Sequence, residues 1–193
     1  MICALAVCVA MCGCATQPAQ VVNSVNSVNS VNFSDPDDIS AHIDITYDNF
    51  TRLTSFGGPK ITTPEVKSSN GSESTGPVVV TLNASRVGAV TQYFVVVTVP
   101  YYDEDWRFYS SVFGYDNASF KPRVDRQVVA CRGKCTYMES INFTVTRAYL
   151  EKHTGGTGAL FRLKGNRRDM DFWLPGQYVA GLLKMVDANA KAQ

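Results

Sequence analysis

Charged residues are scarce in this sequence. They make up 18% of its 193 residues, and 18 basic against 17 acidic side chains leave a net charge of +1. This scarcity excludes a highly charged disordered chain and a long coiled coil. The near-zero balance also argues against a nucleic acid as partner, because nucleic-acid-binding domains carry a strong basic excess. What is present, 45% hydrophobic and 11% aromatic residues, suffices for a single folded domain with its own core.

A long hydrophobic run is also missing. The apolar segment Ile2–Cys12 is shorter than the ~20 residues that a membrane-spanning helix needs, but it has the length of the hydrophobic part of a signal peptide. The first basic residue of the sequence is Arg52, so the basic segment that normally precedes such a run is absent. We therefore expect either a start further upstream or a weak signal.

The apolar segment leads into Gly13-Cys14, followed by Ala15. This junction resembles the lipobox of bacterial lipoproteins. The resemblance implies that residues 1–13 form a signal peptide and that Cys14 becomes the lipidated first residue, carrying acyl chains such as palmitate. Ala15 in place of aspartate resembles the outer-membrane sorting signal of Gram-negative bacteria. The expected localisation is therefore the outer membrane, lipid-anchored and facing the periplasm, with an ordinary cleaved secretory signal as the alternative.

A three-residue repeat of valine, asparagine and serine follows over residues 22–32. It carries no charge and no large apolar face, so it cannot bury enough surface to offset the entropy lost on ordering it. We interpret residues 14–38 as a lipidated amino terminus and flexible tether. Residues 39–190 are then a single β-rich domain.

Six Asn-x-Ser/Thr triplets leave a further hypothesis open. In a eukaryotic secreted protein they would be glycosylation sites, and the chain would be a glycosylated β-sandwich. A chain rich in Asn, Ser and Thr produces such triplets by chance, and the Gly13-Cys14 junction favours a bacterium. The asparagines are Asn32, Asn49, Asn70, Asn83, Asn117 and Asn142.

Strand patterns dominate from residue 39 onward. Residues 43–47 alternate apolar and polar, as a half-buried strand does. Residues 91–99 are β-branched and nearly all apolar, as in a central strand that is covered on both faces. Two hairpins are predicted by pairs of such runs that flank short turns. The hairpins span 124–131 with 135–146 and 159–164 with 170–174, and residues 77–82 and 107–113 are further strand candidates.

Two helices are expected. Thr146 can cap a short helix over 147–153, and Pro175 suits the first turn of a longer helix that reaches about residue 188. Apolar side chains recur along the longer helix at helical spacing, which favours packing on the sheet. The predicted fold is mainly β: an antiparallel β-sandwich or bent sheet with a short helix and one C-terminal helix packed on it. The apolar stripe consists of Tyr178, Val179, Leu182, Leu183 and Val186.

Of the six cysteines, only Cys131 and Cys135 remain once the signal is removed and Cys14 is lipidated. On a straight strand they would lie about 13 Å apart, beyond disulfide reach, but across a turn at Gly133 they become facing partners. An oxidising periplasm favours the bond. A redox-active pair is less favoured because it normally shows Cys-x-x-Cys at a helix start, and zinc or haem ligation lacks its motifs.

Asp103, Glu104 and Asp105 form a contiguous acidic cluster. Clustered carboxylates can bind Ca²⁺ or serve as general acid and base. The spacing of an EF-hand is missing, so a solvated turn between two strands is the preferred interpretation. No metal or other cofactor is expected.

Basic residues gather at the two predicted hairpins. They can form a patch for an anionic partner. Solvated hairpins, whose charges discourage edge-to-edge aggregation, are the preferred interpretation. The candidate patch consists of Lys121, Arg123, Arg126, Arg132, Lys134, Arg167 and Arg168.

Histidine, the most frequent general base, is nearly absent. His42 and His153 are the only two, and no Gly-x-Ser-x-Gly or His-Glu-x-x-His motif accompanies them. We therefore assign no catalytic residue, and an enzyme is not favoured.

Loose motifs between residues 100 and 185 resemble small β-rich envelope proteins of Gram-negative bacteria, a resemblance that brings no activity with it. We expect a lipid-anchored periplasmic β-domain with a non-catalytic binding or structural role, acting on an envelope protein or a cell-wall polymer. A periplasmic hydrolase or another small-molecule enzyme with an unrecognised site is the alternative. The motifs are residues 105–109, Glu139, and residues 163–165, 174–178 and 181–183.

Overall fold

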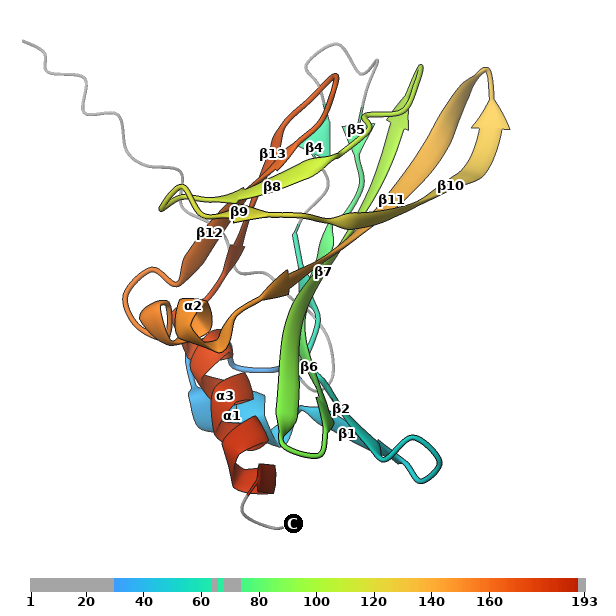
Figure 1. Cartoon of the computed structure of the whole chain (residues 1–193). Coiled ribbons are helices and arrows are strands. Elements are labelled where there is room, and N and C mark those ends of the chain that lie inside the picture. The colour runs from blue at the N-terminus through green and yellow to red at the C-terminus, as the bar shows by residue number, and fades with distance from the viewer. Residues whose placement is uncertain (1–29, 64–65, 68–73, 191–193) are drawn as a thin grey trace, which may run out of the picture. The chain divides into compact units, whose positions relative to one another are not determined.

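The computed structural model describes residues 30–63, 66–67 and 74–190 (Figure 1). The described residues from Val31 onward form one compact unit. This unit is mainly β, with antiparallel sheets and a C-terminal helix, which confirms the predicted fold class. No helix in the described ranges is long and apolar enough to cross a membrane.

The larger of two sheets contains nine strands, all of them paired antiparallel. They are β1 (Asp44–Asp48), β2 (Leu53–Gly57), β3 (Ile61–Thr62), β4 (Val66–Lys67), β5 (Ser74–Thr75), β6 (Val79–Val87), β7 (Val90–Asp103), β10 (Arg123–Arg132) and β11 (Lys134–Val145). The main path through the sheet is β1-β2-β6-β7-β11-β10. Gly88 and Gly133 sit in the turns that join β6 to β7 and β10 to β11, with φ of +56° and +83°. Such tight turns need positive φ, which is why glycine stands at both points.

Only one face of this sheet is fully buried. From Tyr93 to Asp103, buried side chains on β7 alternate with half-buried ones. The expectation that residues 91–99 are covered on both faces is therefore wrong, and their β-branched composition suits a half-exposed sheet surface instead. β1 also differs from the half-buried strand that its alternating sequence predicts, because all five of its residues are exposed. It is the last strand at one edge of the sheet.

A second antiparallel sheet packs against one half of the first (Figure 1). It consists of β8 (Ser111–Gly114), β9 (Ser119–Phe120), β12 (Ala159–Lys164) and β13 (Met170–Leu174), in the order β13-β12-β8-β9. Aromatic rings fill the space between the sheets. The ring of Phe143 on β11 lies 5.4 Å from that of Phe161 on β12, and Phe161 and Phe172 stack at 5.1 Å. The result is a two-layer β structure with an aromatic core.

Within the described ranges, three helices cover the rest of the buried face. α3 (Gly176–Ala190) packs on β6 and on α1 (Pro36–Ala41), while α2 (Arg147–Lys152) follows β11. The predicted apolar stripe of α3 is buried, and its Tyr178 hydroxyl accepts a bond from Leu82 N at 2.9 Å and donates one to Pro59 O at 2.8 Å. The stripe is therefore core, as its spacing predicts.

The folded unit begins before residue 39, the start expected from the sequence. Asp35 caps α1 by accepting a bond from Asp37 N at 2.8 Å, and Ile39 is fully buried against α3. A Cβ at Gly181 would lie 2.7 Å from Ile39 Cγ2, so the close approach of the two helices requires glycine there. Residues 31–38 thus belong to the domain, because Asp35 and Ile39 supply a cap and an anchor that the tether interpretation overlooked. The rest of the predicted tether, up to residue 29, lies outside the described residues.

Replacing Leu182 by alanine should test the packing of α3. Leu182 is fully buried, and the loss of a buried leucine costs about 2–5 kcal/mol. Lys184→Ala is the matched control, since Lys184 is exposed and forms only a surface ion pair with Asp37. Thermal unfolding should show a sharply lower Tm for Leu182→Ala alone. Equal Tm values for the two variants would contradict the core assignment.

Candidate functional site

Residues 104–110 connect β7 of the large sheet to β8 of the small one. This β7–β8 connector is held by the carboxylate of Glu139 on β11, which has no exposed surface. A buried charge without partners costs several kcal/mol, so its partners decide whether it is tolerated. Glu139 accepts bonds from the Tyr101 hydroxyl at 2.6 Å, Phe108 N at 3.0 Å, Tyr109 N at 3.1 Å and Arg126 Nε at 3.1 Å.

Arg107 fixes the connector from its other side. Its guanidinium lies over the Tyr101 ring, 4.2 Å from the centroid, and Nη1 donates to Thr75 Oγ1 at 2.7 Å. Burial raises the pKa of Tyr101, so the hydroxyl stays protonated and can donate to Glu139. The next residue, Phe108, has φ of +51°, a left-handed conformation that costs a non-glycine residue about 1–2 kcal/mol. The bonds from Phe108 N and Tyr109 N to Glu139 offset this strain.

The three clustered carboxylates do not converge. Asp103 is buried beside Arg107, with 3.4 Å between Oδ2 and Nε, instead of lying in a solvated turn. Glu104 pairs with Lys134 at 3.0 Å, and the exposed Asp105 accepts a bond from the backbone N of Trp106. Nowhere in the described residues do three or more His, Cys, Asp or Glu side chains form a group that could hold a metal ion.

The seven basic residues of the candidate patch are divided between structural and exposed positions. Arg126 binds Glu139 and lies 5.2 Å from the Phe108 ring centroid. Lys134 and Arg167 reach the acidic cluster, at Glu104 and Asp103. These three pairs engage three of the seven residues, and they tie the tip of one hairpin to the β7–β8 connector and the tip of the other to the end of β7. The remaining members, Lys121, Arg123, Arg132 and Arg168, are exposed.

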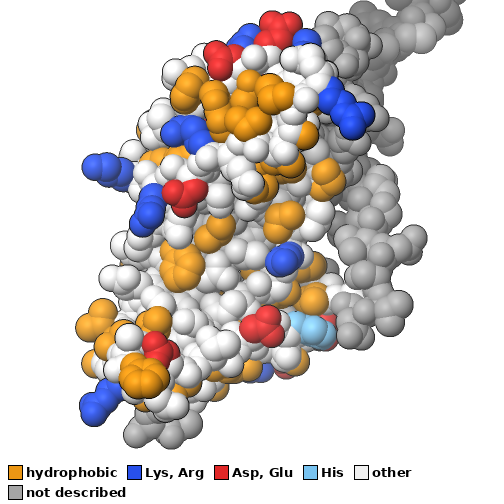
Figure 2. All heavy atoms as spheres, turned by 90° about the vertical axis from the view of Figure 1, so that its right-hand side faces the viewer, with side chains coloured by type: hydrophobic (Ala, Val, Ile, Leu, Met, Phe, Trp, Pro, Cys, Tyr) orange, Lys and Arg blue, Asp and Glu red, His pale blue; other side chains and the backbone are white. Residues whose placement is uncertain are grey.

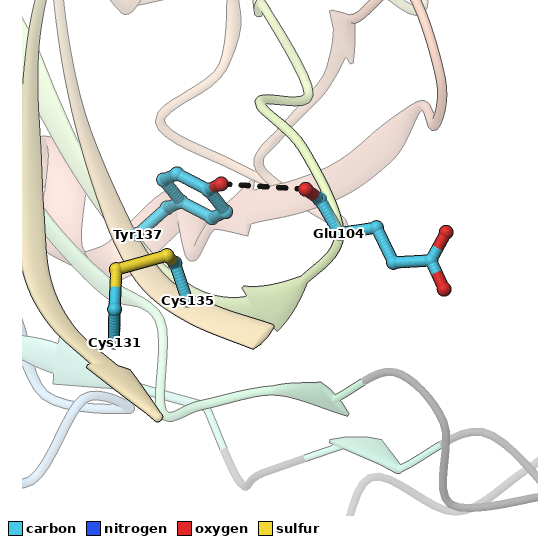
Figure 3. The surroundings of a disulfide bond; sticks show 4 residues. All are labelled: Glu104, Cys131, Cys135 and Tyr137. Carbon is cyan, nitrogen blue, oxygen red and sulfur yellow. Dashed lines mark hydrogen bonds between the residues drawn. A yellow bond between two sulfur atoms is a disulfide. The ribbon is translucent and has the colours of Figure 1, made fainter. Parts of the chain in front are cut away.

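A disulfide joins Cys131 and Cys135 at the tip of the β10–β11 hairpin (Figure 3). The two residues are facing partners in the ladder, with 4.1 Å between their Cα atoms, as expected from the turn at Gly133. Tyr137 lies beside the bond, and its hydroxyl points to the backbone oxygen of Glu104 at 3.4 Å, while the Glu104 side chain points away. The disulfide therefore stiffens the hairpin at the point where it meets the connector.

The two histidines are engaged at helix ends. Nδ1 of His42 lies 2.7 Å from Asp38 O, and Nδ1 of His153 lies 2.7 Å from Tyr149 O. Each ring is thus bonded to the backbone of its own short helix. Cys14, the predicted lipidation site, lies outside the described residues.

The outer face of the small sheet presents a different set of side chains. β12 alternates strictly, so Leu160, Arg162 and Lys164 point outward while Phe161 and Leu163 enter the core. Tyr115, directly after β8, is 85% exposed. The other exposed apolar side chains of this face are Phe113, Leu160 and Trp173.

Charged side chains on this face are paired with one another. Arg162 donates two bonds to Asp171, at 2.6 and 2.8 Å, and Lys164 lies 2.5 Å from Asp169. The hydrogen bond from Arg162 lowers the pKa of Asp171, and the bond from Lys164 lowers that of Asp169, so both carboxylates are ionised at neutral pH. The face is therefore polar but carries no net charge from these four residues.

A hollow of about 310 Å³ opens on this face between β8 and β12. Gly114 lines it, and a Cβ there would lie 2.6 Å from the Tyr149 hydroxyl and 2.7 Å from Asp116 Oδ1, so a larger residue would have to displace these side chains. The hollow is not lined by His42, His153 or the acidic cluster, the residues around which a hydrolytic site was conceivable. Its lining includes Phe113, Tyr115, Asn117, Leu160, Arg162 and Asp171.

Sequence reasoning missed both the Glu139 network and this face, although signals for each were present. Tyr137, Ile141 and Phe143 mark one inward face of β11, and Glu139 falls on the same parity. The alternation along β12 likewise places Leu160 outward. No family model, no curated protein and no solved structure matches the chain, so the candidate site rests on geometry.

Replacing Glu139 by alanine should release the β7–β8 connector from β11 and destabilise the domain. The change leaves Arg126 without its carboxylate and removes the acceptor of the buried Tyr109 N–H and of the partly buried Phe108 N–H, which costs about 3–5 kcal/mol. Glu104→Ala is the control, because this side chain is 65% exposed and its pair with Lys134 contributes about 0–1 kcal/mol. Urea unfolding gives both free energies, and a loss below about 1 kcal/mol for Glu139→Ala would contradict the assigned role.

Proposed function

We propose that the protein is a lipid-anchored component of the bacterial cell envelope that binds an uncharged glycan strand without catalysing a reaction. The outer face of the small sheet, defined by Phe113, Tyr115, Leu160, Trp173 and the Arg162–Asp171 pair, is the binding face. The observation that carries the proposal is the combination on one sheet of exposed aromatic rings with an internally neutralised ion pair.

The chemistry of sugars matches this combination. A pyranose ring presents apolar C–H faces, which pack on exposed aromatic rings, and hydroxyl groups, which both donate and accept hydrogen bonds. Arg162 and Asp171 hold each other in a bidentate arrangement and so present fixed donors and acceptors to such hydroxyls. Because the pair is neutral overall, it offers no field that selects an anionic or cationic ligand. An uncharged hydroxyl-rich ligand is therefore favoured.

The size of the hollow supports a short stretch of polymer as ligand. Small-molecule pockets have volumes of about 300–1,000 Å³, and the hollow between β8 and β12 falls at the lower end of this range. Exposed aromatic side chains around a polar centre are typical of interaction sites. One or two sugar units fit the hollow, and the neighbouring Trp173 offers a further ring beyond it.

Two features support the proposed location. The junction at Gly13-Cys14 resembles a lipobox, and lipid attachment there would hold the domain at a membrane. The Cys131–Cys135 disulfide suits an oxidising compartment such as the periplasm. The proposed localisation is the outer membrane, with the domain facing the periplasm, because Ala15 in place of aspartate resembles the outer-membrane sorting signal.

Replacing Cys14 by serine should release the protein from membranes. The substitution removes the thiol of the residue that directly follows Gly13, and no helix in the described part of the chain is long and apolar enough to span a bilayer. Fractionation of Gram-negative cells that express each form, combined with labelled palmitate, measures the effect. Labelled wild type in the membrane fraction and unlabelled, released Cys14→Ser are expected. A wild type that takes up no palmitate contradicts lipid anchoring.

Removing single rings from the binding face should weaken glycan binding. Each aromatic contact contributes about 1 kcal/mol, so Tyr115→Ala and Trp173→Ala should each raise the Kd about fivefold. The full-length protein is tested with insoluble peptidoglycan by co-sedimentation and with a soluble tetramer of N-acetylglucosamine by calorimetry. Phe50→Ala is the matched control, since Phe50 is a fully exposed aromatic residue in the β1–β2 turn.

The two probes separate the explanations. Binding of both probes, weakened by the two face variants and unchanged by Phe50→Ala, supports a glycan ligand. Binding of peptidoglycan alone points to its peptide or charged groups and contradicts an uncharged ligand. Equal losses in all three variants, or no binding of either probe, also contradict the proposal.

A further inference from the structure

The turn between β6 and β7 is apolar, although turns of this kind are normally polar. Residues 87–90, which close this hairpin, are Val, Gly, Ala and Val, and all four are exposed. Hairpin turns are usually rich in glycine, asparagine, aspartate and serine, whose polar groups bond to the backbone or to water. Contiguous exposed apolar side chains are typical of interaction sites for proteins or membranes. The turn is therefore a candidate contact surface.

The neighbouring β1–β2 turn adds aromatic side chains. Phe50 at its tip is 100% exposed, and Tyr47 just before it is 55% exposed. The turn is ordered, because the Asp48 carboxylate accepts bonds from Phe50 N at 2.8 Å and from Thr51 Oγ1 at 2.7 Å. An ordered turn thus presents a large apolar ring to solvent.

The two turns adjoin each other, because Leu53 of β2 pairs with Val87 of β6. Both turns lie at the lower end of Figure 1, and Figure 2 shows exposed hydrophobic side chains at that end. We refer to this surface as the hairpin end. It consists of Tyr47, Phe50, Val87, Ala89 and Val90.

Apolar side chains stand on both faces of the sheet at the hairpin end. Tyr47 lies opposite the buried Thr54 and therefore points to the inner face. Val87 lies opposite Leu53, the neighbour of Thr54 along β2, and therefore points to the outer face. Phe50 lies beyond the last pair of the β1–β2 ladder. A protein surface covers one face of such a hairpin, whereas a fluid apolar medium surrounds its end, so this geometry favours a lipid bilayer.

The charge of the hairpin end favours zwitterionic lipid. Residues 47–53 contain one acid, Asp48, and one base, Arg52, and residues 87–90 contain no charged side chain. Hydrogen bonds from Thr51 and Phe50 lower the pKa of Asp48, so its carboxylate is ionised at neutral pH and balances Arg52. Binding to anionic lipid needs clustered basic residues, which this end lacks.

The length of the chain before the domain brings the hairpin end within reach of a membrane. Cys14, the proposed site of the lipid, lies 16 positions before Ser30, the first described residue. A chain of that length spans at most about 55 Å. α1, which follows Ser30 closely, lies in the same lower half of Figure 1 as the two turns, whereas β8 and β12 lie in the upper half. Tethering at this range raises the effective concentration, so that weak contacts suffice.

We propose that the hairpin end enters the surface of a zwitterionic phospholipid bilayer, with Phe50 and Val90 below the headgroups and Tyr47 at their level. The inference rests on the proposed lipid anchor, which holds the domain near the membrane. Tyrosine suits the headgroup level because its ring is apolar and its hydroxyl polar. The contact turns the proposed glycan face away from the membrane. So few side chains do not retain the protein on a membrane without its lipid, which agrees with the expected release of Cys14→Ser.

Quenching of tryptophan emission by brominated lipids tests the contact. Residues 14–193, which contain the whole compact unit, are coupled through the Cys14 thiol to a maleimide lipid in phosphatidylcholine vesicles; Cys131 and Cys135 are bonded to each other and do not react. The coupling replaces the natural lipid, so the outcome does not depend on lipidation in cells.

A Phe50→Trp variant supplies the reporter. Its new ring should lie about 5–10 Å into the boundary between headgroups and acyl chains. Brominated lipid should therefore remove most of the emission that the variant adds to that of wild type. Wild type should be quenched little, because its Trp106 and Trp173 lie outside the hairpin end. The quenching should persist at 1 M salt, where the screening length is about 3 Å, because the contact is apolar.

A second substitution in the reporter variant locates the contact. Val90→Asp places a charge in the hairpin end and should abolish the quenching. Val129→Asp is the matched control and should leave it unchanged, since Val129 on β10 is 54% exposed against 65% for Val90. Quenching that is absent, that survives Val90→Asp or that is lost at 1 M salt overturns the proposal. Such a result leaves the proposed function standing, because palmitate uptake and glycan binding are measured separately.

Discussion

The buried carboxylate of Glu139 is the interaction on which the arrangement of the two sheets depends. It stands on the large sheet, yet two of its donors, Phe108 N and Tyr109 N, belong to the segment that leads to the small sheet. The cost of burying an unpaired charge exceeds that of most single contacts, so a chain path that misplaced these donors would be strongly destabilised. One side chain thus couples the path of the connector to the stability of the whole domain.

The position of the candidate binding face depends on how Glu139 holds the connector. The connector continues into β8, and Asn166 N in the β12–β13 turn donates to Arg107 O at 2.8 Å. β8 and β12 are therefore both registered against the connector, and the hollow lies between them. The aromatic core beneath, through Phe143 and Phe161, holds the sheet from its other side. A rigid support of this kind lets an exposed face keep one shape when it meets a ligand.

Local patterns in the sequence predict much of the fold, because alternation and helical spacing are properties of neighbouring residues. Both hairpins, the buried stripe of α3 and the facing cysteines follow from such patterns. The exposure of β1 does not, since whether an alternating strand is covered depends on its place at the edge of a sheet. The partition into two sheets and the partners of Glu139 also depend on residues far apart in the chain, such as Tyr101 and Arg126. Tyr115 and Trp173 are far apart in the sequence. That they share one face follows only once it is known which strands form the small sheet.

Hydrogen exchange of individual backbone amides tests the role of Glu139 most directly. Phe108 and Tyr109 lie in a segment without regular secondary structure, where amides normally exchange quickly. If the carboxylate holds them as described, both amides should exchange as slowly as the central amides of β11, through global unfolding alone. Exchange at the rate of the exposed β1–β2 turn, residues 49–52, would show that the connector opens freely and would contradict the account.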